Sequence, residues 1–358
     1  MATNNAAADI LLTQMATNAK DRPRYSKQQL ERYFDRIELP QKYRNSPVLS
    51  DPALARTKEH GLPLIRAFTR YHTSHIPFEN LQMHYSATRM ISLNMDDLYD
   101  RFADTAGCGN GGRCMQNNGF FGTVMRSLGY NVRNGGSRVS RSMYPDTIIR
   151  EQQATTYDPW DHMVNFVKFD SEWWLVDVGM AAMGPNMPIP IEDNFVTNSI
   201  GGRKIRLQLR VIPEHAAGDL EDAPKLWCFD VSHSQNPDGT DIWLPTYCFT
   251  MTEFLPQDYE CASWYTTTYP RSYFARWLLV TKMILSEDGE EVVGDMSLVN
   301  NVVQKRILGK KEFAQELKTE EERVTALEDL FGIMLSEEDR KAISPHMKLG
   351  WSDQDNSG

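Results

Sequence analysis

A run of glycines leads into a single cysteine at the expected start of a helix. Residues 107–118 read GCGNGGRCMQNN, and apolar side chains then recur at roughly helical spacing over residues 120–128. This pattern places Cys114 in the first turn or at the cap of a helix that Gly129 ends. Unpaired backbone N–H groups and the positive end of the helix dipole favour a thiolate at such a position. Cys114 is therefore the candidate nucleophile.

The same stretch allows three simpler interpretations. Its glycines fit the dinucleotide spacing GxGxxG, but a predicted helix rather than a strand precedes them, and no acidic residue stands near Val132 to bind a ribose. A phosphate-binding loop would need Lys and Ser or Thr where Arg113 and Cys114 stand. A buried structural cysteine stays open, because free cysteines are among the most buried residue types.

Two neighbouring segments of alternating polarity offer partners for the cysteine. Residues 161–169 and 172–178 alternate at period two on either side of a two-residue turn, which predicts a β-hairpin. In the register that this turn sets, His162 and Asp177 are diagonal neighbours on one face, with Cα atoms about 7–8 Å apart. A slip of one residue would place them on opposite faces.

A cysteine, a histidine and an aspartate in this order match a generalised catalytic triad. Cys114 would be the nucleophile, His162 the base and Asp177 the group that orients the histidine. Taken separately, the histidine suits an ordinary hydrogen-bonded strand position and the aspartate a strand end. The catalytic interpretation gains weight because Asp is depleted in strands, and a carboxylate within WWLVDV needs a compensating partner.

The totals of the chain restrict its class and its partners. With 358 residues, 41% hydrophobic and 24% charged, it has the composition of a soluble protein of two or three domains. A formal net charge of −10 argues against nucleic acid or an anionic membrane as partner, so small molecules are expected. Without a transmembrane stretch or a targeting peptide, a cytoplasmic location is expected, with a monomer favoured.

Metal and disulfide sites are not expected. The five cysteines form no C-x-x-C pair, and their odd count argues against a disulfide framework or a zinc site. Three histidines cluster, but their spacing fits no known ligand set, so surface and loop roles are expected for His72, His75 and His84.

The rest of the chain predicts an α+β framework. Residues 1–25 are expected to form a mobile arm, and residues 26–131 a helical bundle that carries the cysteine. Residues 132–252 change to short alternating segments, which predict a central antiparallel β-barrel with the histidine and the aspartate. Residues 253–358 are expected to form a C-terminal α/β domain.

Local signals predict several helix boundaries. Ser26 and Gln29 form a capping-box signature, Pro63 is expected to open a helix over residues 62–71, and another helix covers residues 95–102. A last helix is expected over residues 320–331, after a strand pair that turns at residues 287–289.

The barrel region is expected to contain turns and long loops between its strands. The predicted strands cover residues 164–169, 173–178, 204–211, 226–231 and 247–252. Asn134, Gly135 and Gly136 indicate a turn. Residues 140–161 and 180–199 are expected to be long loops.

The motifs together resemble those of the arylamine N-acetyltransferase family. Besides GGRCMQNN, DHMVNFVKF and WWLVDVGM, the chain contains HTSHIPFENL from His72 and WYTTTYPRSYF from Trp264, in the family's order and approximate spacing. The resemblance implies a cysteine-protease or transglutaminase-like catalytic core under a C-terminal lid. It also implies ping-pong transfer: Cys114 takes an acyl group from acyl-coenzyme A, a co-substrate with no permanently bound cofactor, and passes it to an arylamine or arylhydrazine.

The acyl donor and the substrate contacts are less specific. Acetyl-CoA is the default expectation, and malonyl-CoA is the alternative because the length and the inserted loops resemble those of fungal members, some of which prefer it. Phe78 is expected to line the acceptor pocket, and Arg113 and Arg138 are candidate cations for an anionic acyl group. The expected turn through Gly136 offers backbone N–H groups for phosphates, with an ordinary hairpin turn as the alternative.

One departure from the family and two rival functions stay open. The family usually has Arg where Asn110 stands, and that Arg commonly pairs with the glutamate of PFENL, here Glu79; whether Arg113 or another cation replaces it stays open. The rivals are a papain-like hydrolase or transglutaminase-type enzyme with the same triad order, and a non-catalytic scaffold.

Overall fold

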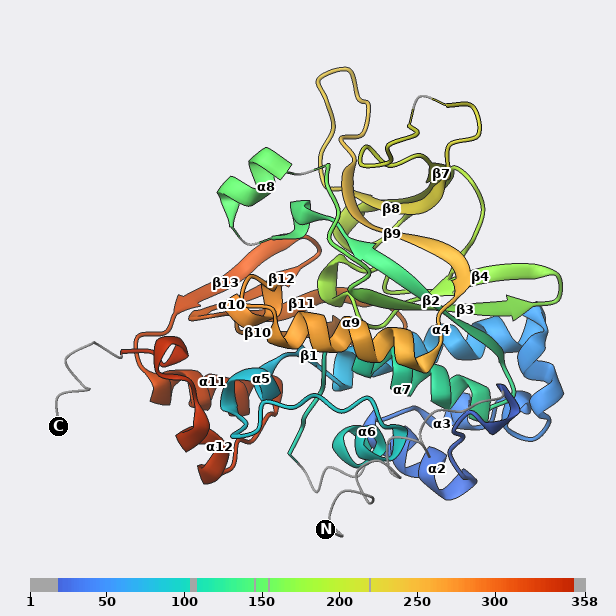
Figure 1. Cartoon of the computed structure of the whole chain (residues 1–358). Helices are drawn as coiled ribbons and strands as arrows, with labels where there is room; N and C mark the ends of the chain where they lie inside the picture. Colours follow the sequence, from blue (N-terminus) through green and yellow to red (C-terminus); the bar gives the residue numbers. More distant parts are fainter. Residues whose placement is uncertain (1–18, 104–107, 145, 154, 219, 351–358) are drawn as a thin grey trace, which may run out of the picture.

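The computed structural model describes residues 19–103, 108–144, 146–153, 155–218 and 220–350 (Figure 1). Most of the predicted mobile arm lies outside these residues. Tyr25, near the end of the arm, is buried against the helical layer, where its hydroxyl donates to the Met95 carbonyl and its N–H to Ser127 Oγ, both at 2.8 Å. None of the described helices is long and apolar enough to cross a membrane.

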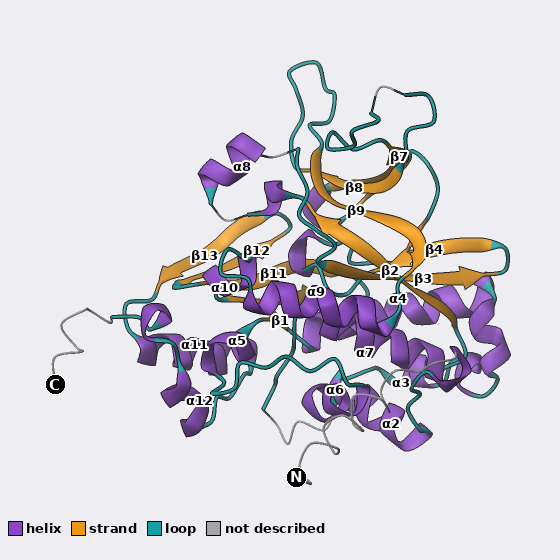
Figure 2. Cartoon of the chain, in the orientation of Figure 1, coloured by secondary structure: helices purple, strands orange, loops and turns teal. Residues whose placement is uncertain are grey.

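A layer of helices forms one side of the molecule (Figure 2). Its helices are α2 (Lys27–Arg36), α3 (Gln41–Arg44), α4 (Lys58–His75), α5 (Leu81–Tyr85), α6 (Met95–Phe102) and α7 (Cys114–Ser127). The predicted capping box is present, since Ser26 and Gln29 exchange side-chain and backbone hydrogen bonds at the start of α2. Helix α6 has the predicted bounds. Phe120, Phe121 and Val124 of α7 pack into the largest apolar cluster.

Helix α4 begins earlier than predicted. Thr57 caps it by accepting from the His60 N–H, so Pro63 lies inside the helix and the prediction that Pro63 opens it is wrong. A proline inside a helix removes one backbone hydrogen bond. Burial of the flanking Leu62 and Leu64 offsets this loss.

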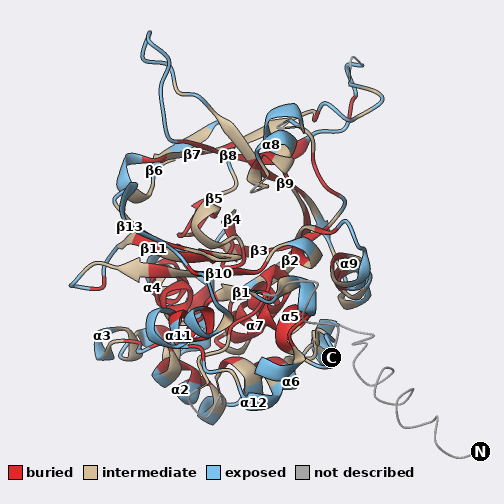
Figure 3. Ribbon diagram, turned by 90° about the vertical axis from the view of Figure 1, so that its left-hand side faces the viewer, coloured by how far each residue is buried: buried red, intermediate tan, exposed pale blue. Residues whose placement is uncertain are grey.

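The expected antiparallel barrel is an eight-stranded sheet in the order β5-β4-β3-β2-β9-β8-β7-β6. Its strands are β2 (Asn131–Val139), β3 (His162–Phe169), β4 (Glu172–Val176), β5 (Ile189–Pro190), β6 (Phe195–Asn198), β7 (Lys204–Arg210), β8 (Leu226–Ser232) and β9 (Leu244–Glu253). The sheet curls until its edges approach each other, around a core that includes Phe166, Leu207 and Phe229 (Figure 3). Strand alternation in the sequence therefore predicted the barrel correctly.

Two turn and loop predictions in this region are corrected. Gly135 and Gly136 lie within β2, a strand paired with both β3 and β9, so the predicted turn is wrong. A Cβ on Gly135 would lie 2.2 Å from the Phe166 ring, and one on Gly136 would lie 2.2 Å from the Phe254 ring. The glycines therefore admit two aromatic rings to the strand. The expected long loops contain α8 (Thr147–Gln153) and the short strands β5 and β6.

A second sheet joins the C-terminal third to the helical layer. Its strands β1 (Phe78–Glu79), β10 (Leu279–Leu285), β11 (Val292–Val299), β12 (Val302–Ile307) and β13 (Lys310–Glu316) are antiparallel in this order. The remaining helices are α9 (Pro256–Thr268), α10 (Tyr273–Arg276), α11 (Glu320–Phe331) and α12 (Glu337–Ala342). Helix α11 has the predicted bounds. Strand β1 contains part of the PFENL motif, so the predicted helical domain contributes a strand to this C-terminal sheet. The predicted domain boundaries at residues 131 and 252, and the predicted role of the C-terminal domain as a lid, stay predictions.

Candidate active site

Cys114 is the first residue of α7, as predicted. Its N-cap is Arg113, whose backbone N–H donates to Gln116 Oε1 at 3.0 Å. The cysteine side chain is buried, and Sγ lies 3.6 Å from the main-chain oxygen of Asp161. Cys114 therefore belongs to the first helical turn, whose N–H groups have no partner within the helix.

The hairpin of β3 and β4 has the predicted register. Phe169 pairs with Glu172 and Asn165 with Val176. Asp177 follows the last strand residue, and its Oδ2 accepts a hydrogen bond from His162 Nε2 at 2.9 Å. Both side chains are 1% exposed or less. The structure thus brings together the three residues that sequence analysis selected as catalytic candidates.

Charge and hydrogen bonding determine the protonation of the histidine. Burial by itself would lower the pKa of His162, but the Asp177 carboxylate and a hydrogen bond with the Cys114 thiol raise it to about 10. Burial would raise the pKa of Asp177, but the His162 charge and hydrogen bonds from His162, Asn118 and the Gly179 N–H lower it. Because Nε2 is bound to Asp177, Nδ1 is the ring nitrogen available to the thiol.

Asn118 ties the three segments together, and sequence analysis gave it no role. Its Nδ2 donates to Asp177 Oδ1 at 2.8 Å and to the Met163 carbonyl at 2.6 Å, while its Oδ1 accepts from the Val178 N–H at 3.0 Å. The signal was present in the sequence, because residues four apart lie on one face of a helix and Asn118 is four residues after Cys114.

Gly179 is a second residue without a predicted role. A Cβ at this position would lie 2.7 Å from Cys114 Cα and 2.5 Å from Asn118 Nδ2. Its N–H donates to Asp177 Oδ1 at 2.7 Å. The strand end and the helix start can approach this closely only because position 179 carries no side chain.

Arg101 is the cation that pairs with Glu79. Arg101, in α6, places a guanidinium nitrogen 2.5 Å from Glu79 Oε1, and its Nε donates to the Gly111 carbonyl at 2.5 Å. Arg113, the candidate raised by the sequence, makes no such pair. The partner of Glu79 therefore comes from a preceding helix instead of position 110.

Replacing Arg101 with methionine is expected to destabilise the fold. The Glu79 side chain is 1% exposed, so the substitution would leave a buried carboxylate without its cation. Breaking such a pair typically costs about 3–5 kcal/mol of unfolding free energy, which denaturant titration would measure. Lys341→Ala, which removes an exposed pair with Glu337, serves as the control and should leave the midpoint unchanged. Equal midpoints for wild type and Arg101→Met would contradict the prediction.

The four predicted substrate residues differ in their placement. Phe78 packs against the apolar cluster that contains Cys114 and Met163, so it lies near the nucleophile. Its role as a wall of the acceptor pocket stays a prediction. Gly136 is not in a turn, so its proposed role in binding phosphates through a flexible turn has no structural basis. Arg138 lies 4.2 Å above the Trp160 ring and donates to the Asp158 carbonyl at 3.2 Å. Arg113 is buried beside α9.

Two of the three clustered histidines are buried within helices. His72 and His84 are buried in helices, so the predicted surface and loop roles are wrong. The His72 ring bonds to the Tyr33 hydroxyl and to Asn117 Oδ1, both at 3.1 Å, and burial lowers the pKa of His72 to about 3. The described residues contain no group of three or more side chains suited to a metal.

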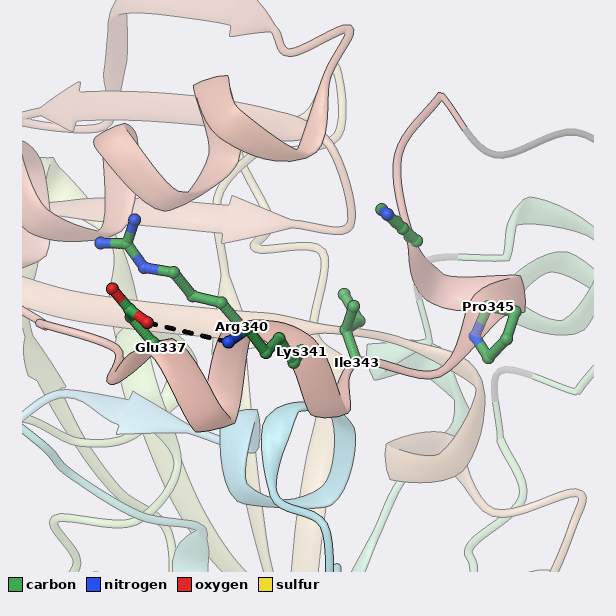
Figure 4. A pocket seen from close by; sticks show the side chains of 6 residues that line it. Glu337, Arg340, Lys341, Ile343 and Pro345 are labelled. Atoms are coloured by element: carbon green, nitrogen blue, oxygen red, sulfur yellow. Dashed lines mark ion pairs between the residues drawn. The ribbon is translucent and has the colours of Figure 1, made fainter. Parts of the chain in front are cut away.

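A surface cavity in the C-terminal third contains none of these residues. It is lined by Glu337, Arg340, Lys341, Ile343, Pro345 and Lys348 (Figure 4). Arg340 and Lys341 follow Glu337 on α12, and Glu337 pairs with Lys341. The residues that line this cavity are different from those around Cys114.

Comparison with known proteins agrees with the fold and with the motifs. An N-acetyltransferase family model matches residues 61–340. N-malonyltransferase FDB2 of Fusarium pseudograminearum is 49% identical over 91% of this chain and 94% of its own length, and FDB2 of Gibberella moniliformis is 45% identical over 94% and 97%. The arylamine N-acetyltransferase of Escherichia coli is 27% identical over 67% and 71%.

Solved structures show the same architecture. The arylamine N-acetyltransferase of Salmonella typhimurium covers 89% of this chain and 98% of its own, with 20% identity and a TM-score of 0.67. That of Mycobacterium marinum in complex with CoA covers 89% and 98%, with 24% identity and a TM-score of 0.66.

The chain belongs to the arylamine N-acetyltransferase family, as the motifs predicted, and its fold class is confirmed. It is an N-acyltransferase. The names of the more similar relatives favour the malonyl alternative over the default acetyl donor.

Proposed function

We propose that this protein transfers a malonyl group from malonyl-CoA to the amino group of an aromatic amine, through a malonyl-cysteine at Cys114. The observation that carries the chemistry is the buried set of Cys114, His162 and Asp177, with its hydrogen-bonded imidazole. The names of the relatives that are 45–49% identical support the donor. Acetyl-CoA is the alternative donor, because more distant relatives are named arylamine N-acetyltransferases.

The first half-reaction loads the cysteine. The Cys114 thiolate attacks the thioester carbonyl carbon, and N–H groups at the start of α7 stabilise the oxyanion. The carbon–sulfur bond to CoA then breaks, and the CoA thiolate takes the proton held by His162. The raised pKa of His162, about 10, keeps this proton available at neutral pH. Free CoA leaves, and Cys114 carries the acyl group.

The second half-reaction transfers the acyl group to nitrogen. The free amine attacks the carbonyl carbon of the acyl-cysteine, and His162, now neutral, removes the proton from the amine. The nitrogen–carbon bond forms as the carbon–sulfur bond to Cys114 breaks, which restores the thiolate and the protonated imidazole. Asp177 holds the ring in the orientation that both transfers need.

An aromatic acceptor suits the side chains around the sulfur. Phe78, Phe254 and Tyr259 belong to or pack against the cluster that contains Cys114. Flat apolar rings favour a flat apolar substrate. The location of the protein in the cytoplasm and its monomeric state are expectations that accompany this proposal.

A donor panel tests the proposal. Malonyl-, acetyl- and propionyl-CoA would be compared with one aromatic amine, and kcat/KM is expected to be highest for malonyl-CoA. Propionyl-CoA is the matched control, because it has a similar chain length without the carboxylate. A preference for acetyl-CoA would overturn the malonyl assignment while leaving the acyltransferase intact. Burst kinetics with peptides instead of acyl-CoA would favour a hydrolase.

A further inference from the structure

Arg113 is a buried cation whose guanidinium donates to uncharged hydroxyls. Its side chain is 3% exposed, and among the ion pairs of the described residues none involves Arg113. Its guanidinium donates to Ser263 Oγ at 3.0 Å and to the hydroxyls of Thr266 and Thr267, each at 2.9 Å. Its buried Nε has no hydrogen-bond partner. At least one donor of this guanidinium is therefore free.

The hydroxyl partners do not neutralise the charge. Thr266 and Thr267 direct their own protons to main-chain oxygens of Ala262 and Ser263, at 3.0 and 2.7 Å, so they accept from Arg113 as neutral groups. Burial lowers the pKa of Arg113 to about 10, while the charges of Cys114 and Glu79 act to raise it, so Arg113 stays charged at neutral pH. A buried charge is costly unless an anion compensates it. Arg323, also buried, has such an anion in Glu320, at 2.5 Å.

The position of Arg113 places this charge next to the reacting atoms. Arg113 immediately precedes the nucleophile, and its guanidinium lies 5.2 Å from the centre of the Phe274 ring. The Phe274 ring lies 6.2 Å from that of Phe78, which packs in the Cys114 cluster. The cation, the Phe274 ring, the Phe78 ring and the cluster that contains Cys114 are thus successive neighbours.

The acyl group named for the similar relatives would supply a carboxylate that the guanidinium can contact directly. In a malonyl thioester the carboxylate is separated from the reacting carbonyl by a single methylene, so its charge must lie close to the nucleophile. A planar guanidinium with a free donor can bind a carboxylate by charge and hydrogen bond together. An acetyl group has no carboxylate for the guanidinium to bind.

The other candidate cations have contacts of their own away from the start of α7. Arg101 is paired with Glu79. Arg138 is stacked on Trp160 and donates to the Asp158 carbonyl, in a segment with the buried carboxyls of Asp158 and Asp161.

We propose that Arg113 is the specificity-determining residue that binds the free carboxylate of the acyl group, and so selects donors that are half-thioesters of short dicarboxylic acids. This inference rests on the proposed acyl transfer through Cys114. The inference adds to the proposed function the residue that recognises the donor.

The test compares donors and variants. For Arg113→Met, the ratio of kcat/KM for malonyl-CoA to that for acetyl-CoA is expected to fall roughly 10- to 100-fold, the loss typical of a hydrogen bond to a charged group. Arg113→Lys, which keeps the charge, should restore part of the ratio. Arg340→Met is the matched control, since it removes an exposed cation of α12 from a different part of the protein and should leave the ratio unchanged.

Different results would contradict the role of Arg113 and the proposed function. If both donors lose activity equally in Arg113→Met, Arg113 only positions Cys114 and the inference is wrong. An unchanged ratio would overturn it as well. Should Arg113→Met fail to fold, wild type can be compared on malonyl-CoA and its neutral methyl ester; equal use of the two would also refute carboxylate recognition. If none of the acyl-CoA donors acylated Cys114 in wild type, the proposed function itself would be overturned.

Discussion

Replacing Cys114 with alanine is expected to abolish acyl transfer. The proposed intermediate forms on this sulfur, so the turnover rate should fall by roughly 10⁴-fold or more. Mass spectrometry of the intact protein, recorded after mixing with acyl-CoA and no amine, should show an added acyl group on wild type and none on Cys114→Ala. The measurement is direct because it detects the intermediate and needs no knowledge of the acceptor.

The other cysteines provide the control for this experiment. Cys261 is exposed on α9, whereas Cys228 and Cys248 are buried in the barrel, where burial raises the pKa of Cys228 to about 11. Cys261→Ala is therefore expected to retain the adduct. If the adduct persisted in Cys114→Ala, the nucleophile would have been assigned wrongly.

Replacing Asp177 with asparagine is expected to lower kcat/KM by roughly 10³- to 10⁴-fold. Asparagine keeps the shape of the side chain but removes the charge that raises the pKa of His162. The imidazole would then lose its proton at a lower pH and could no longer supply it to the departing CoA. His162→Ala should have a loss of similar size, because no other described group bonds to both the thiol and Asp177.

The pH dependence separates this role from a simple loss of structure. In wild type the protonated imidazole is expected to persist until the pH rises through about 10, so acylation should decline only above that value. In Asp177→Asn the decline should move to lower pH. The same sign applies to stability: the contribution of the raised pKa of His162 is complete below about 6.5 and is lost as the pH approaches 10.

Stopped-flow acylation at a series of pH values would measure the shift. Asp238→Asn, in an exposed turn, is the control and should leave the profile unchanged. An Asp177→Asn variant with the profile of wild type and only a lower rate would contradict the electrostatic role of Asp177.

Local signals in the sequence were sufficient for much of the site. The capping box of Ser26 and the start of α7 at Cys114 depend on residues a few positions apart, whose hydrogen bonds form within one helical turn. The hairpin register depends on a two-residue turn and on alternation, so the pairing of His162 with Asp177 followed from the sequence.

Long-range packing decided the predictions that were wrong. Gly135 and Gly136 carry the usual signal of a turn, but the space beside them is filled by Phe166 and by Phe254, which is distant in the sequence. Similarly, Pro63 suggested a helix start, and burial of its neighbours extends α4 on both sides. A local pattern gives no information about a ring that arrives from another strand.

The sequence by itself determined the family, several of the main helices and strands, and the three residues of the candidate triad, because these depend on short-range spacing. Only the tertiary structure decided which charges are compensated. It gave Glu79 a partner in Arg101 and surrounded Arg113 with hydroxyls from a helix some 150 positions later in the chain. Whether a buried charge has a counter-ion depends on contacts between distant segments, and no local periodicity specifies these.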